Sequence, residues 1–198
     1  MQILRIDSAT TGEQSVSRRI SQMIADHFSE KHPDATFVTR DLSTDPVPHL
    51  DPVTTAAVRT APETHEESVE RAYPEQKGVL DEFLGSDIVI IGAPMYNFSV
   101  PSNLKAWMDR LAVPGVTFGY SENGPEGKAG GRRVIIASSR GGEYGDDNSI
   151  DHQESLLKGF MGFLGIDSVD VIRVEKVGYG EEAIEEGIAA AKKEIASL

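Results

Sequence analysis

The chain of 198 residues has the length of one ordinary domain, long enough to bury a core between a sheet and two layers of helices. Its 32 acidic residues outnumber its 19 basic ones, and the net charge of -13 argues against nucleic-acid and anionic membrane partners. Without cysteine it has no disulfides or thiolate nucleophiles, and no stretch resembles a signal peptide or a membrane span. We therefore expect a single cytoplasmic domain over residues 1–198.

Short apolar runs alternate with amphipathic stretches along the chain. The apolar runs predict strands over 3–7, 36–41, 87–93, 133–138 and 168–174, of which 36–41 is expected at an edge. Helical periodicity predicts helices over 15–30, 76–84, 102–111, 149–164 and 181–197. This alternation is typical of an α/β protein and predicts a doubly wound, five-stranded parallel sheet of order 2-1-3-4-5 with helices on both faces.

Two segments interrupt the alternation. Residues 44–74 are rich in proline and acidic residues, and we expect a loop that leads into helical surface structure. Residues 116–131 form a glycine-rich excursion that carries Phe118 and Tyr120. We expect this excursion beside the carboxyl end of the third strand and its helix.

The turn after the first strand, residues 7–17, contains small hydroxylated residues and opens a helix. Unpaired N–H groups and a partial positive charge at a helix N-terminus suit a phosphate, and Ser8, Ser15 and Ser17 can add hydroxyl donors. Plain N-capping by Ser15 is an equally open interpretation. The turn matches neither a Walker A loop nor G-x-G-x-x-G, which argues against ATP and a Rossmann-bound dinucleotide.

Residues 92–101 follow the third strand directly and are bracketed by Pro94 and Pro101. The prolines favour a rigid ledge, on which Met95, Tyr96 and Phe98 would cover a flat ring while backbone N–H groups bind its heteroatoms. The alternative is an ordinary turn with its aromatic side chains packed on a neighbour. We favour the ligand because the prolines enclose a Met-Tyr-Asn-Phe run.

A pair of glycines, Gly141 and Gly142, follows the fourth strand. Paired glycines let a backbone approach a ligand closely, although they also make simple turns. In the expected fold this loop and the two before it lie at one edge of the sheet, around the switch point between the first and third strands. Their common position favours a shared ligand.

Three motifs occur in a specific order: Ala-Pro-Met-Tyr-Asn-Phe at 93–98, Gly-Val-Thr-Phe with Asn-Gly-Pro-Glu-Gly at 115–127, and Ser-Arg-Gly-Gly at 139–142. In this combination the chain resembles the FMN-dependent NADH-azoreductases, which are also NADH:quinone oxidoreductases. The resemblance runs from residue 3 to near the C-terminus. It implies a flavodoxin-like homodimer with one FMN per subunit near the dimer interface.

The resemblance also implies roles for individual residues. The phosphate of FMN would lie at Ser8, Ser15, Val16 and Ser17, the edge of the isoalloxazine ring at Met95, Tyr96, Asn97 and Phe98, and the far side of the ring at Ser139, Arg140, Gly141 and Gly142. Tyr120 and Phe163 resemble aromatic residues that border the substrate space, and Phe163 would reach the flavin of the partner subunit.

A bound flavin performs the redox chemistry itself, which agrees with a sequence that shows no catalytic triad. We expect two electrons to pass from NADH or NADPH through FMN N5 to a quinone or azo acceptor, in a ping-pong cycle that Asn97 supports through its main-chain N–H. The five histidines lack metal-ligand spacing, so no metal site is expected.

Two other functions are compatible with such a fold. An electron carrier without substrate turnover would not need the substrate wall that Phe118 and Tyr120 are expected to build. A phosphoacceptor signalling module would need clustered acids where the third strand ends, and the sequence has Gly-Ala-Pro there.

Overall fold

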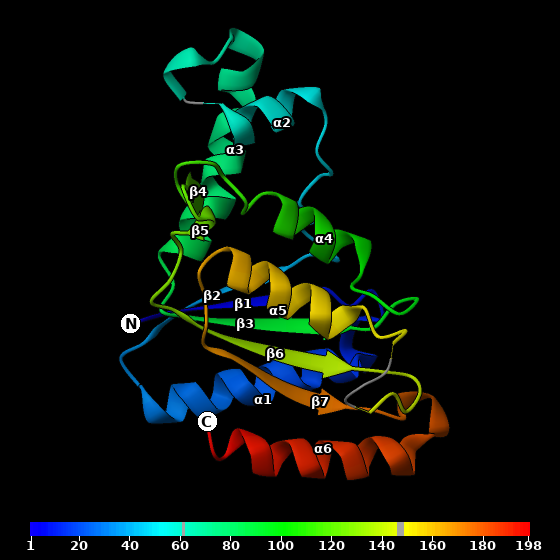
Figure 1. Ribbon diagram of the computed structural model, residues 1–198. Helices are drawn as coiled ribbons and strands as arrows, with labels where there is room; N and C mark the ends of the chain where they lie inside the picture. Colours follow the sequence, from blue (N-terminus) through cyan, green and yellow to red (C-terminus); the bar gives the residue numbers. More distant parts are fainter. Residues whose placement is uncertain (61, 146–148) are drawn as a thin grey trace.

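The computed structural model describes residues 1–60, 62–145 and 149–198. Its main sheet has five parallel strands in the order β2-β1-β3-β6-β7 (Figure 1). In chain order these are β1 (Gln2–Asp7), β2 (Thr36–Asp41), β3 (Ile88–Pro94), β6 (Arg133–Ser139) and β7 (Val169–Val174). The order 2-1-3-4-5 predicted for the parallel sheet is therefore confirmed.

The position of each strand in the sheet explains its sequence. All seven residues of β3 are buried, because helices cover both faces of the central strands, and such strands are continuous apolar runs. In β2 no residue is fully buried, as expected for an edge strand. The register pairs Asp7 with Gly92 and Pro94 with Ser139, so the strands end at one common edge.

Helices flank the sheet on both sides (Figure 1). Helices α1 (Val16–Lys31) and α6 (Glu181–Ile195) lie on one face, and α3 (Glu67–Leu84), α4 (Ser102–Asp109) and α5 (Gln153–Phe163) lie on the other. Each face has its own buried cluster, one containing Ile20 and Ile188 and the other Phe83 and Leu157. Trp107 of α4 is fully buried and meets Phe83 edge to face at 6.0 Å.

The segment 44–74 is more helical than predicted. Helix α2 (Pro52–Arg59) begins with a reciprocal capping box between Asp51 and Thr54, and a short 3-10 turn, η2, covers Pro62–Thr64. Helix α3 begins at Glu67 rather than at residue 76 because it continues through Pro74. The expected loop ended at this proline, but a helix can tolerate the loss of one hydrogen bond when the rest of it packs well.

The segment 116–131 folds into an antiparallel hairpin of β4 (Phe118–Ser121) and β5 (Gly124–Gly127), which was not predicted. The hairpin packs on the end of α5, where a Cβ on Gly127 would lie 2.0 Å from the backbone nitrogen of Gly165. The expected position beside the carboxyl end of the third strand is therefore wrong. Parallel strands all start at the same edge of the sheet, so after α4 the chain must return to that edge before β6 starts. The hairpin lies in this returning segment (Figure 1).

Two further differences concern the ends of helices. Helix α5 starts at Gln153 rather than at residue 149, and the carboxylate of Asp151 accepts a hydrogen bond from the Gln153 N–H at 2.9 Å. Helix α6 ends at Ile195 rather than at residue 197. The remaining short turns are η1 (Gly12–Gln14), before α1, and η3 (Val177–Tyr179), after β7.

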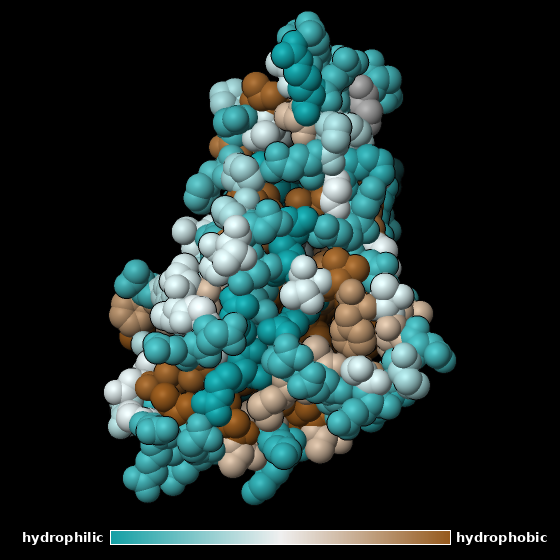
Figure 2. Space-filling view, turned by 180° about the vertical axis from the view of Figure 1, so that it is seen from behind, coloured by the Kyte–Doolittle hydropathy of each residue, from teal (hydrophilic) through white to brown (hydrophobic). Residues whose placement is uncertain are grey.

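Seen from behind the view of Figure 1, the molecule shows a surface that is mostly hydrophilic, with hydrophobic residues in separate patches (Figure 2). This agrees with the strongly acidic composition. None of the helices in the described ranges is both long enough and apolar enough to cross a membrane.

Candidate functional site

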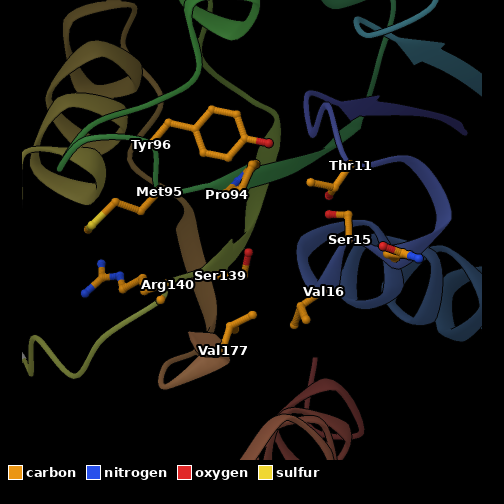
Figure 3. Close-up of a pocket in the computed structure, with 11 residues that line it drawn as sticks. Thr11, Ser15, Val16, Pro94, Met95, Tyr96, Ser139, Arg140 and Val177 are labelled. Atoms are coloured by element: carbon orange, nitrogen blue, oxygen red, sulfur yellow. The ribbon is translucent and has the colours of Figure 1, made fainter. Parts of the chain in front are cut away.

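A cavity of about 260 Å³ opens at the carboxyl edge of the main sheet (Figure 3). The three loops singled out in the sequence meet around it, together with η3. Its lining consists of Thr11, Gln14, Ser15, Val16, Pro94, Met95, Tyr96, Ser139, Arg140, Gly141 and Val177. The tertiary structure thus joins segments that are far apart in the sequence.

The first loop brings the N-terminus of α1 to the cavity. Ser15 is the N-cap of this helix, since its Oγ accepts a hydrogen bond from the Arg18 N–H at 3.2 Å, and it also lies 3.0 Å from the Ser17 hydroxyl. The N–H groups of Val16 and Ser17 have no partner among the residues the structure describes. Capping and anion binding are therefore compatible at this helix end.

Ser8 has a different environment from the other serines of this loop. It is fully buried, its hydroxyl donates to the carbonyl of Gly92 at 2.7 Å, and its N–H donates to the same oxygen at 3.2 Å. Asn103 donates from its side-chain amide to the Ser8 carbonyl at 3.1 Å. Ser8 thus ties the end of β1 to the end of β3 and does not line the cavity.

The second loop is a tight turn of type I′ over residues 96–99. The backbones of Tyr96 and Ser99 exchange two hydrogen bonds, of 2.9 and 3.1 Å, and both central residues are left-handed, with φ of 49° at Asn97 and 71° at Phe98. A left-handed aromatic residue is unusual and carries about 1 kcal/mol or more of strain. In the described part of the chain the N–H groups of Asn97 and Phe98 have no partner. The ledge predicted from the prolines is therefore held mainly by backbone hydrogen bonds.

Hydrogen bonds lock the three loops to one another. The Met95 N–H donates to the Ser139 carbonyl at 2.7 Å, and the Thr10 N–H donates to the Tyr96 hydroxyl at 3.1 Å. Thr10 also holds this hydroxyl through its own side chain at 3.0 Å. These contacts fix the distances between the loops across the cavity.

The third loop pairs with the segment after β7. The carbonyls of Arg140, Gly141 and Gly142 accept hydrogen bonds of 2.9 Å from the N–H groups of Val177, Gly178 and Lys176, respectively. The N–H groups of Gly141 and Gly142 have no partner within the described ranges. A Cβ on Gly141 would meet nothing within 4 Å, so this glycine faces open space.

Tyr120 and Phe163 do not line the cavity of their own chain. Both contact Phe118, with ring centroids 5.7 Å and 4.7 Å away, and Tyr120 is 79% exposed. Phe163 ends α5, whereas Glu154, near its start, contacts Arg140 beside the cavity. At 1.5 Å per residue, about 14 Å of helix separates the aromatic cluster from the cavity.

Basic residues near the first loop are already paired. Arg18 lies 2.6 Å from the Asp41 carboxylate and 3.8 Å from that of Asp7, which Arg5 also contacts at 2.7 Å. Burial opposes ionisation of Asp41, but hydrogen bonds from Ser43 and Arg18 outweigh it and hold the pKa of Asp41 below its usual value. An anion in the cavity would therefore rely on backbone N–H groups and hydroxyls more than on a free cation.

Sequence reasoning missed four lining residues. Thr11 and Gln14 precede the predicted helix start, Pro94 had been assigned only a role in rigidity, and Val177 follows the last strand. A signal for the first two existed, because residues just before a helix at this edge of the sheet face the same space as its N-terminus. Nothing in the local sequence indicated Val177, which reaches the cavity through its backbone pairing with Arg140.

Comparison with known proteins places this geometry in a family. The model of the flavodoxin-like fold family matches residues 1–198. The chain is 46% identical over 202 residues to an FMN-dependent NADH:quinone oxidoreductase of Rhizobium meliloti (strain 1021), covering 99% of this chain and 96% of that protein. It is 45% identical over 208 residues to an FMN-dependent NADH:quinone oxidoreductase of Azospirillum brasilense, covering 100% and 97%.

The solved structures agree with this relationship. A crystal structure of azoreductase from Bacillus anthracis str. Sterne superposes with a TM-score of 0.88 at 25% identity, and the match covers 100% of both chains. The chain therefore belongs to the flavodoxin-like fold family, as a relative of the FMN-dependent NADH:quinone oxidoreductases.

Proposed function

We propose that this chain is an FMN-dependent oxidoreductase that transfers two electrons from NADH or NADPH to quinones and reductively cleaves azo compounds. Its similarity over nearly the full chain to FMN-dependent NADH:quinone oxidoreductases, and to an azoreductase, supports an enzyme of this class. The same similarity supports FMN as the cofactor and NADH as an electron donor.

The observation that carries the proposal is a set of backbone N–H groups, two at each of the three loops, that have no partner among the described residues. They belong to Val16, Ser17, Asn97, Phe98, Gly141 and Gly142; Val16 and Gly141 line the cavity, and the others lie within two residues of a lining residue. FMN offers acceptors at matching chemical positions, with a phosphate at one end and carbonyl and ring nitrogen atoms at the other. Because Gly141 has no side chain, the open space beside it leaves room for a flat ring.

The residues of the chain would bind and orient the reactants. FMN, when bound, supplies hydride chemistry at its N5 atom. Val16, Ser15 and Ser17 would hold the phosphate at the N-terminus of α1, and Met95 and Tyr96 would cover the ring. The N–H groups of Asn97 and Gly141 would favour negative charge on the reduced ring, because fixed donors aimed at a developing charge need no reorganisation.

Ser8 has a supporting place in this proposal. The family pattern puts it at the phosphate, and its burial against Gly92 supports a role in holding the loop that carries the phosphate donors. We infer that its hydroxyl acts on FMN through this loop.

We further infer that the protein is a homodimer in which Tyr120 and Phe163 border the FMN of the partner subunit. In its own chain this aromatic cluster lies at the far end of α5 from the cavity, and Tyr120 is 79% exposed. A second subunit would bring such a cluster over the ring. The single doubly wound FMN-binding domain over residues 1–198 and its cytoplasmic location belong to the same proposal.

The visible spectrum of the purified protein tests the function. We expect a bound yellow chromophore, released by acid as FMN, that NADH bleaches without oxygen and that a quinone or an azo dye restores with multiple turnovers. Bleaching without turnover of either acceptor would indicate an electron carrier. A colourless protein that takes up no FMN would contradict the proposal altogether.

A further inference from the structure

Arg140 combines two properties that rarely occur together. It is part of the cavity wall, yet its side chain is 0% exposed. Figure 3 shows this side chain extending away from the side of the cavity that Ser15 and Val16 form. Its guanidinium therefore does not offer its charge to the cavity directly.

Three carboxylates hold this guanidinium. Asp151 lies 2.7 Å from it, Glu154 2.5 Å and Glu175 3.2 Å. Glu154 lies in the first turn of α5 and Glu175 follows β7, so Arg140 connects the end of β6 to both neighbouring elements. We call these four residues, with Arg173 and Lys158, the Arg140 cluster.

Among the described residues, the Arg140 cluster contains equal numbers of positive and negative side chains. Arg173 contacts Glu154 at 2.7 Å and Lys158 contacts it at 3.3 Å, so three cations face three carboxylates in the described part of the chain. Burial alone would raise the pKa of Glu154, but the Arg173 hydrogen bond and the charges of Arg140 and Lys158 outweigh it, and this pKa lies below its ordinary value. Removal of any one of these six charged side chains changes the charge beside the cavity by one unit.

The cluster also fixes the backbone of the third loop. The Arg140 N–H donates to the Val174 carbonyl at 2.9 Å, immediately before Glu175. The Glu175 carboxylate accepts the N–H groups of Tyr144 and Gly145 at 3.1 and 3.2 Å, beyond the glycine pair. Gly141 and Gly142 are thus held from both sides, with their own N–H groups left unpaired.

We propose that Arg140 is a positioning residue whose ion pairs with Asp151, Glu154 and Glu175 aim the N–H groups of Gly141 and Gly142 at FMN, and that the charge balance of the Arg140 cluster sets the reduction potential of the bound flavin. This inference rests on the proposed FMN-dependent function. The sign of the effect follows from Coulomb's law, because reduction adds negative charge to the ring and excess positive charge nearby stabilises it.

The midpoint potential of bound FMN in single variants of the Arg140 cluster tests the effect of its charges. Glu154→Gln leaves excess positive charge and raises the potential, while Arg140→Gln leaves excess negative charge and lowers it. We expect about a tenfold change in the reduced-to-oxidised equilibrium in each direction, which is about 30 mV for a two-electron couple. Where Arg140→Gln fails to fold, Arg173→Gln removes a cation from the same cluster and lowers the potential as well.

The double variant Arg140→Gln with Glu154→Gln separates positioning from charge. It removes one cation and one anion, so its net charge and its potential stay close to those of the parent, but it lacks the ion pairs that hold the loop. Its Kd for FMN, measured by fluorescence titration of the apoprotein, therefore rises about tenfold, equivalent to about 1.4 kcal/mol.

A matched control uses the other end of β6. Arg133 pairs with Asp170 at 2.7 Å, about 20 Å along the strand from Arg140, and Asp170→Asn makes the same change in charge as Glu154→Gln. We expect its potential to stay at the parent value. Shifts of the same sign in Glu154→Gln and Arg140→Gln, or an equal shift in Asp170→Asn, would overturn the proposed role while FMN binding by the parent still supports the function. Failure of the parent itself to bind FMN would overturn both.

Discussion

Gly92 shows how one missing methyl group shapes the site. A Cβ there would lie 2.6 Å from the Asp7 carboxylate, which is 1% exposed and accepts a 2.6 Å hydrogen bond from Ser21. We predict that Gly92→Ala lowers the free energy of unfolding by about 1–3 kcal/mol, because the buried carboxylate has little room to move. Urea denaturation measures the change.

Gly78 provides the control for that substitution. It is an exposed residue within α3, and an added Cβ would meet nothing within 4 Å. Gly78→Ala is expected to raise the free energy of unfolding by about 0.5–1 kcal/mol through helix propensity. Equal effects of the two substitutions would argue against the contact with Asp7 as the cause.

A substitution at Gly141 can change FMN binding without changing the stability of the apoprotein. Its φ is not positive, and a larger side chain would extend into open space. We predict that Gly141→Val leaves the free energy of unfolding of the apoprotein within about 0.5 kcal/mol of the parent but raises the Kd for FMN at least about tenfold, because the side chain takes the volume of the ring. Unchanged affinity for FMN would show that the cofactor does not approach this glycine.

At the scale of elements, α3 contains a proline that was expected in the loop before the helix. Pro74 lies within the helix, where it cannot donate to the carbonyl of Glu70. We predict that Pro74→Ala raises the free energy of unfolding by about 1 kcal/mol, because the missing hydrogen bond is restored and alanine favours helix. Thermal and chemical denaturation should both show this increase in the free energy of unfolding.

Pro52 is the matched position for this test. It occupies the first turn of α2, where a backbone N–H has no acceptor within the helix and proline is favourable. Pro52→Ala is expected to bring no gain in stability. A gain of similar size at both positions would contradict the proposed cause, because Pro52 does not interrupt a hydrogen bond within its helix.

At the scale of the whole molecule, the proposed homodimer predicts complementation between two impaired variants. Tyr120→Ala keeps its cavity but lacks the aromatic side chain, and Gly141→Val keeps the side chain but binds FMN more weakly. Mixed dimers formed by co-expression contain one site in which an intact cavity meets an intact Tyr120. We predict quinone reductase activity above the sum of the two variants expressed alone.

The outcome of this experiment depends on which chain supplies Tyr120. Activity of the mixture equal to the sum of its parts would contradict a site shared between subunits. Size-exclusion chromatography of each variant serves as the control, because a variant that remains monomeric cannot complement. Tyr120 is 79% exposed in the single chain, so its removal should leave the subunit folded.

Local sequence determined the main sheet and the three loops. The continuous apolar run of β3 and the polar character of β2 follow from burial on two faces and at an edge, and this burial pattern is fixed by residue type. The pairing of strand ends then brings the loops together, since all parallel strands finish at one edge. Residues of the motifs at 93–98 and 139–142 therefore line one cavity together with the first loop.

Tertiary structure decided what each side chain does there. Ser8 and Arg140 are polar residues in site loops, yet one bonds to Gly92 and the other turns to three carboxylates, because their nearest partners come from distant segments. Tyr120 lies at the far end of α5 because the chain must return to the amino edge before β6 begins. Sequence periodicity reports which residues are buried, but the direction of a buried polar side chain depends on partners that only the folded chain brings within reach.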